Sequence, residues 1–219
     1  MFFSSNDLHA IRLSLQVSAV ATVVFLIPGV FLGTWLARTR SSWRVVVQGL
    51  VTVPLVLPPV VTGLCLLYVL VEIDSPIRFT WWAAVLASGT VAIPLLVRNV
   101  RAGVEAMDPR LPIVAATLGA SRFRSFFTIT LPVCWKGIVG GIVLFWARAM
   151  GEFGAVMVVA TNTPGSTQTI PLAIYSKLES PKSPTIWPLV VVSLLISVLA
   201  IIFSEWLIQK RRRLGRTVS

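Results

Sequence analysis

Residues 114–132 read VAATLGASRFRSFFTITLP, a short stretch that is basic, aromatic and rich in hydroxyl groups. Long apolar stretches precede and follow it. These neighbours have the length expected of helices that cross a membrane. The role of the quoted stretch therefore depends on what surrounds it.

The composition of the whole chain indicates an integral membrane protein. Of its 219 residues, 56% are hydrophobic and only 12% are charged, and the mean hydropathy is +0.86. An ordinary globular domain carries about 25% charged residues. A soluble protein of this composition would have too little polar surface to stay in water, so we predict an all-α integral membrane protein.

Five apolar segments are long enough to cross a bilayer as helices, because a hydrocarbon core of about 30 Å needs about 20 helical residues. They are residues 13–37, 46–71, 81–100, 137–160 and 187–208. All five contain proline or glycine, which spanning helices tolerate better than soluble ones do. No internal repeat or second domain is evident, so residues 1–219 are predicted to form a single transmembrane domain.

The basic residues favour one orientation in the membrane. Five spans place the termini on opposite sides, and with the N-terminus outside, the inner segments carry fourteen lysines and arginines and the outer segments four. This distribution follows the positive-inside rule. We therefore predict an outer N-terminus, a cytoplasmic C-terminus and a cytoplasmic position for residues 114–132. The longest outer stretch, residues 161–185, is predicted to be an ordered, turn-rich loop.

The cytoplasmic stretch is predicted to form two short helices joined by a sharp corner. Residues 108–118 make the first helix, with proline near its start. Gly119 ends it, because glycine readily adopts the left-handed conformation. Ser121 caps a second short helix, RFRSFFT, and Pro132 opens the next span. An amphipathic helix lying at the membrane surface would present the same basic and aromatic groups.

This stretch resembles the cytoplasmic signature of ABC importer permeases, which reads E-A-A, three residues, G, nine residues, then I-x-L-P. Four residues stand at the matching positions: Gly119, Ile129, Leu131 and Pro132. Ala115 matches the second alanine, whereas Ile113 and Val114 replace the glutamate and the first alanine. The acidic start of the signature is therefore missing from this chain.

The resemblance extends over most of the chain. VPLVLPPVVTGLCLLY (53–68), FWARAMGEFGAVMVVATN (145–162) and PGSTQTIPLAIY (164–175) resemble the molybdate-type permeases, which share much with the sulfate-type. The resemblance implies a type I ABC importer permease fold in the bacterial cytoplasmic membrane, and a homodimer working with a cytoplasmic ATPase and an external oxyanion-binding protein. It implies molybdate as cargo, with tungstate as a further substrate and a sulfate or thiosulfate permease as the alternative.

By the same resemblance, the segment of about residues 108–132 docks on the ATPase subunit. The residues implied in this contact are Ala115, Gly119, Ala120, Ser121, Arg122, Phe123, Ile129, Leu131 and Pro132. The chain contains no G-x-x-x-x-G-K-[ST] motif, so it has no P-loop to hold phosphates. We expect no cofactor on this chain, and ATP and magnesium on the partner ATPase.

Arg148 and Glu152 stand inside the fourth predicted span, where ionisable residues are expensive and point to function. Their spacing of four residues places them on one helical face, so that they neutralise each other. Such a pair either fixes packing or lines a translocation path, where the arginine offsets the charge of an anion. In the second span, Pro58 and Pro59 remove backbone hydrogen bonds and predict a kink suited to a gate.

Other classes of protein find less support in the sequence. An enzyme inside the membrane would need a catalytic set, and neither H-E-x-x-H nor G-x-S-x-G occurs, so the chain is not expected to be an enzyme. Cys65, Cys134 and the single histidine, His9, form no disulfide or metal pattern. The basic residues flank apolar runs, which favours membrane insertion over nucleic-acid binding. A channel or scaffold without an ATPase remains the remote alternative.

Overall fold

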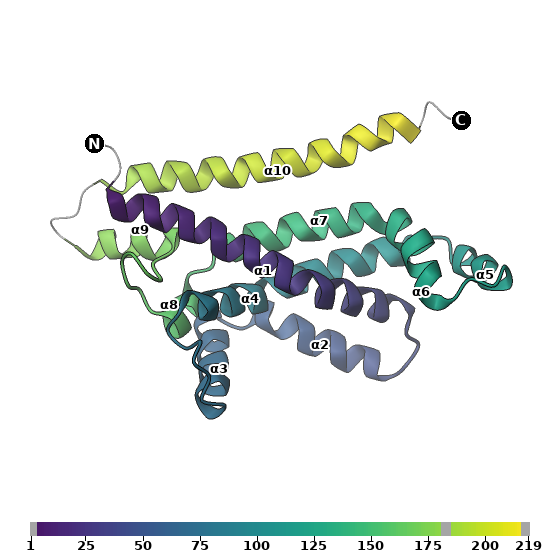
Figure 1. Cartoon of the computed structure of the whole chain (residues 1–219), viewed down its shortest axis with the longest axis horizontal. Coiled ribbons are helices and arrows are strands. Elements are labelled where there is room, and N and C mark those ends of the chain that lie inside the picture. Colours follow the sequence, from purple (N-terminus) through teal and green to yellow (C-terminus); the bar gives the residue numbers. More distant parts are fainter. Residues whose placement is uncertain (1–3, 181–184, 216–219) are drawn as a thin grey trace.

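The computed structural model describes residues 4–180 and 185–215, except for the side chains of residues 204, 205 and 207–215. Every regular element in this described part is a helix (Figure 1). Two basic residues used in the orientation count, Lys182 and Arg216, lie outside it. The elements are α1 (Ser5–Arg38), α2 (Trp43–Val56), α3 (Pro59–Glu72), α4 (Trp81–Glu105), α5 (Arg110–Thr117), α6 (Arg122–Ser125), the π-helical turn η1 (Phe126–Thr130), α7 (Leu131–Met150), α8 (Gly154–Ala160), α9 (Ile170–Glu179) and α10 (Trp187–Gly215).

Helix α4 is the centre of the molecule and packs against both α1 and α7. In its most apolar stretch 67% of the residues are buried, against 22% in α1. Glycines allow this close packing: a Cβ atom at Gly33 of α1 would lie 2.8 Å from the carbonyl oxygen of Val97, and one at Gly137 of α7 would lie 2.7 Å from that of Asn99. Close backbone approach holds helices together in a bilayer, where apolar side chains gain little by leaving lipid.

Within the described part of the chain, three helical stretches are long and apolar enough to cross a membrane: α1, α4 and the continuous helix Arg122–Met150. The α2–α3 pair makes a fourth if its halves count as one span. The spans predicted at residues 13–37 and 81–100 lie inside α1 and α4. The span predicted at residues 187–208 lies inside α10, whose described apolar part is Trp187–Phe203. The prediction of a multi-pass helical protein is confirmed.

The span predicted at residues 46–71 is not one continuous helix. The chain turns by 114° between α2 and α3, which is far more than the kink that was predicted. Leu57 and Pro58 are extended, with ψ angles of 146° and 132°, because a residue that precedes proline is driven away from the helical conformation. Two prolines in succession therefore end one helix and start another.

The span predicted at residues 137–160 is also interrupted. Helix α7 ends at Met150, and α8 begins only at Gly154. Glu152 therefore lies in the break, and the prediction that Arg148 and Glu152 share one continuous helix was wrong. The predicted loop at residues 161–185 was wrong in part, because it contains α9, which has a proline in its first turn, where helices accept that residue.

Several helix ends meet at the end of the molecule that carries α5 and α6. Figure 1 shows the C-terminal end of α1 and the start of α2 on this side. Arg44 of α2 and Arg101 of α4 both form ion pairs with Glu105, at 2.5 and 2.8 Å. Arg38, the last residue of α1, donates a hydrogen bond to the hydroxyl of Thr130. Several arginines that were predicted to face the cytoplasm thus gather at one end.

Candidate functional site

The corner between α5 and α6 has the backbone that the sequence predicted. Gly119 has a φ of +81°, a left-handed conformation that glycine adopts without a steric penalty. The N–H of Ala120 reaches back to the carbonyl oxygen of Ala115 at 2.9 Å, which closes the end of α5. Nothing lies within 4 Å of the position that a Cβ atom of Gly119 would occupy. Glycine therefore adopts this conformation at the lowest cost, although the space around it is open to a side chain.

Ser121 begins the next helix as predicted, because its hydroxyl accepts a hydrogen bond of 3.2 Å from the N–H of Arg124. The predicted break before Pro132 was wrong. Helix α6 continues through η1 into α7, and the N–H of Leu131 donates to the carbonyl oxygen of Phe126, five residues earlier. Because the helix is continuous here, Pro132 cannot donate an N–H to the preceding turn, and the π-helical turn η1 stands directly before it.

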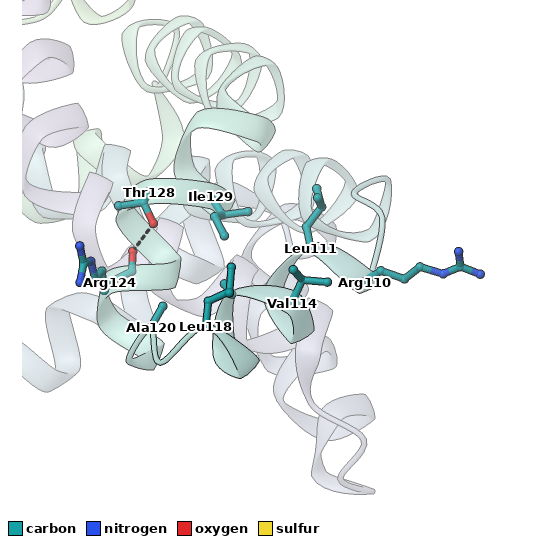
Figure 2. Close-up of a pocket in the computed structure, with 9 residues that line it drawn as sticks. Arg110, Leu111, Val114, Leu118, Ala120, Arg124, Thr128 and Ile129 are labelled. Carbon is teal, nitrogen blue, oxygen red and sulfur yellow. Dashed lines mark hydrogen bonds between the residues drawn. The ribbon is translucent and has the colours of Figure 1, made fainter.

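An apolar pocket of about 440 Å³ lies between α5 and the α6–η1 segment. Figure 2 shows Leu111, Val114 and Leu118 around one side of it and Ile129 on the other. Arg110 and Arg124 stand at its edges. Leu118 is 82% exposed, although leucine is among the residue types most often buried. The pocket and its cationic rim form a surface suited to a partner.

Three phenylalanines form a ridge beside the pocket. The ring of Phe127 lies 4.7 Å from that of Phe123 and 5.1 Å from that of Phe126, edge to face. Phe123 is 74% exposed. Aromatic pairs at this separation attract one another, so each ring helps to hold its neighbour in place.

The structure brings most of the predicted docking residues together. Ala115, Ala120 and Ile129 line the pocket, while Gly119 and Ser121 form the corner above it. Arg122 and Phe123 are exposed beside the pocket. Leu131 and Pro132 are not among the lining residues, because they begin α7. Leu118 and Arg124 were missed as site residues, although both belong to the predicted corner.

Arg148 and Glu152 form the predicted ion pair, with 2.7 Å between Nη1 and Oε2. The carboxylate side chain is 1% exposed and the guanidinium side chain 29%. The second carboxylate oxygen of Glu152 accepts the N–H of Ala155 at 2.9 Å. Glu152 therefore joins the end of α7 to the start of α8, which the sequence pattern did not indicate.

Pro59 lies close to the start of α8, whereas Pro58 is exposed. Helix α3 packs against α8, and a Cβ atom on Gly154 would lie 3.1 Å from the side chain of Pro59. A Cβ atom on Gly63 would lie 2.8 Å from the Cα atom of Ala155. Of the two predicted gate prolines, Pro59 thus belongs with the buried ion pair to one packed unit of α3, α8 and the end of α7.

Residues 161–179 form polar contacts that were not predicted from the sequence. The hydroxyl of Ser176 accepts hydrogen bonds from the amides of Asn162 (2.7 Å) and Gln168 (3.1 Å). Lys177 of α9 forms a largely buried ion pair of 2.7 Å with Asp7 of α1. Partners this far apart in sequence leave no local signal. Within α9, a hydrogen bond to Glu179 raises the pKa of Tyr175.

Among the described residues, no group of three or more His, Cys, Asp or Glu side chains could hold a metal ion. The polar groups of the site are instead arginines, hydroxyls and one buried carboxylate. Guanidinium and hydroxyl groups donate hydrogen bonds to anions. The arrangement suits contact with an anion or an acidic partner.

Residues 29–213 match the family described as "Binding-protein-dependent transport system inner membrane component". The chain is 37% identical to the molybdenum transport system permease protein ModB of Escherichia coli (strain K12), over 99% of this chain and 100% of that protein. It is 35% identical to the molybdate/tungstate transport system permease protein WtpB of Thermococcus kodakarensis, over 93% of this chain and 80% of that one. A chain of the inward facing MetNI methionine ABC transporter has a TM-score of 0.76 at 14% identity, covering 93% of this chain and 94% of that chain.

Proposed function

The chain belongs to the family of binding-protein-dependent transport system inner membrane components, and we propose from this premise that it is the permease subunit of a molybdate importer. As a family member it is a multi-pass protein of the cytoplasmic membrane. Its cargo in this proposal is molybdate, a tetrahedral oxyanion, with tungstate as a second substrate.

One observation carries the choice of cargo. Proteins named as molybdenum transport permeases match this chain at 37% to 39% identity along almost its whole length. A relative in Thermococcus kodakarensis named as a molybdate/tungstate permease matches at 35%. A sulfate or thiosulfate permease is the alternative function, and competition by these anions in the uptake assay tests it.

In the proposed assembly two copies of the chain form the pathway, and each receives a cytoplasmic ATPase at the α5–α6 corner. An exposed pocket flanked by arginines and a ridge of phenylalanines in ring contact support a docking role for this corner. ATP and magnesium bind to the ATPase. An external oxyanion-binding protein delivers the cargo at the opposite end of the molecule.

The proposed pathway runs beside the unit made of α3, α8 and the end of α7. Pro58 and Pro59 set the start of α3, and the Arg148–Glu152 pair fixes the start of α8. Because the guanidinium is more exposed than its carboxylate partner, Arg148 offers positive charge to a passing anion, while Glu152 keeps the guanidinium in place. The gathering of arginines around the corner supports a cytoplasmic location for that end.

The test is uptake into vesicles that contain the intact importer with its ATPase and binding protein. Radiolabelled molybdate is offered alone and with a hundredfold excess of sulfate, thiosulfate or tungstate. We expect ATP-dependent molybdate uptake that tungstate suppresses and sulfate leaves unchanged. Suppression by sulfate would move the chain to the sulfate type, and uptake without ATP would favour a channel.

A further inference from the structure

The docking corner meets the helix bundle through a narrow joint. The main contacts of α5 and α6 are with each other and with η1. In Figure 1 both helices extend beyond the end of the bundle. The corner is therefore connected to the bundle at two places. The five residues of η1 lead into α7 and make the principal connection, and the chain between α4 and α5 makes the other.

The joint has an unusual backbone. A π-helical turn holds one residue more than an α-helical turn, and such turns occur frequently at functional sites. The N–H of Leu131 bonds to the carbonyl oxygen of Phe126 across this wide turn. The wide turn stands directly before Pro132, which has no N–H for the carbonyl of Thr128 and whose ring would clash with that carbonyl in a regular α-helix. The joint therefore lacks the regular hydrogen bonding that stiffens an α-helix.

A contact from a distant helix fixes the present arrangement. Arg38, the last residue of α1, donates a hydrogen bond to the hydroxyl of Thr130, the last residue of η1. The two residues are 92 positions apart, and Thr130 is only 1% exposed. Helix α1 itself packs along α4 and α7. The bond therefore ties the joint to the most extensively packed part of the molecule.

We propose that η1 is the pivot of the docking corner and that Arg38 is a positioning residue that holds this pivot through Thr130. The inference rests on the proposed function, because it assigns a mechanical role within the contact between permease and ATPase. Movement of the corner breaks or strains the Arg38–Thr130 hydrogen bond, so the position of the corner is coupled to the C-terminal end of α1. An arginine bound to a neutral hydroxyl suits this role, because the exposed guanidinium of Arg38 forms hydrogen bonds with water when its bond to Thr130 opens.

Thr130→Val tests the Arg38–Thr130 hydrogen bond most directly, because it keeps the shape of the side chain and removes the hydroxyl that accepts the bond. Thr130→Ser keeps the hydroxyl and serves as the conservative variant. Arg38→Gln removes the donor, and Arg40→Gln is its matched control, because Arg40 is exposed two residues later. Each full importer is reconstituted in vesicles, and molybdate uptake and ATP hydrolysis are measured on the same sample.

Thr130→Val and Arg38→Gln should each lower the ratio of uptake to ATP hydrolysis by about fivefold or more, the scale of a typical coupling between sites. Thr130→Ser and Arg40→Gln should stay within about twofold of the unchanged importer. An unchanged ratio in Thr130→Val, or an equal loss in Arg40→Gln, would overturn the proposal. Failure of Thr130→Val to assemble would also overturn it, because Thr130 would then be a folding contact.

A second measurement does not depend on the cargo. Spin labels at Ala116→Cys in α5 and Ser42→Cys before α2, with Cys65→Ser and Cys134→Ala, report the distance between the corner and the bundle. Thr130→Val should broaden this distance distribution, while Thr130→Ser should not. If the unchanged importer takes up no molybdate and this difference is still seen, the proposed cargo fails and the pivot stands.

Discussion

Helices α2 and α4 pack against each other and are both strongly apolar, but they are buried to very different extents. Helix α4 has thirteen buried residues and α2 has none. The buried residues of α4 include four alanines, one glycine and one serine beside five valines, whereas α2 contains no alanine or serine and consists mainly of valines and leucines. In a bilayer, lipid solvates valine and leucine well, and small residues allow helices to meet closely. Small side chains therefore accompany valine and leucine in the packed interior, and apolar character by itself does not mark it.

The largest effect should come from crowding the α1–α4 contact with Gly33→Leu. A Cβ atom there would lie 2.8 Å from both a side-chain atom of Val100 and the carbonyl oxygen of Val97, and the backbone atom cannot rotate away. Overpacking of this kind costs about 1–3 kcal/mol. We expect a clearly lower thermal unfolding midpoint for the purified permease in detergent, and less protein in the membrane.

Gly49→Leu in α2 is the matched control, because nothing lies within 4 Å of a Cβ atom at Gly49. Its midpoint should stay close to that of the unchanged protein. If Gly49→Leu is as damaging as Gly33→Leu in the assembled importer but harmless in the isolated chain, a second subunit covers α2. Equal damage in the isolated chain would contradict the comparison.

The next effect concerns the Arg148–Glu152 pair, which attaches α8 to the bundle. Arg148→Gln and Glu152→Gln should each impair uptake and stability more than the double variant, because each single change leaves one charge unpaired. Contacting residues usually couple by about 0.5–3 kcal/mol. A double-mutant cycle on the unfolding free energy measures this coupling. Purely additive effects would mean that the two side chains do not act as partners.

Gly119→Asp should leave stability almost unchanged and abolish uptake. Aspartate tolerates the left-handed conformation better than most residues do, and the space around Gly119 is open. The added charge would instead meet the docked ATPase. Gly119→Asn is the control, since it adds the same shape without the charge, and it should retain most uptake. Comparable loss in both variants would point to backbone strain rather than to the interface.

The smallest effect belongs to the labelling test of orientation, which should leave transport intact. Ser176 is half-buried and hydrogen-bonded to two side chains, so the exposed Ser166 is the better outer probe. In a background lacking Cys65, an impermeant thiol reagent should label Ser166→Cys from outside and miss Ser42→Cys. The reverse pattern would invert the proposed topology.

The sequence was sufficient for the fold class and for the local geometry of the corner. The predicted type I ABC importer permease fold is confirmed by the family match and by the likeness to the methionine transporter chain. Gly119 and Ser121 behave as predicted because a left-handed turn and a helix cap depend on residues within about four positions. The docking and gating roles of the site residues stay predictions.

Tertiary structure alone decided the directions of the helices and the partners of the buried polar groups. Prolines at 58 and 59 predicted an interruption, but the 114° turn depends on α3 finding its place against α8. The sequence paired Glu152 with Arg148, yet only the fold shows that Glu152 also starts α8 through Ala155. Arg38 meets Thr130 across 92 positions, and Asp7 meets Lys177 across 170. Such pairs form only after the helices have packed, because nothing in the local sequence of either residue specifies the other.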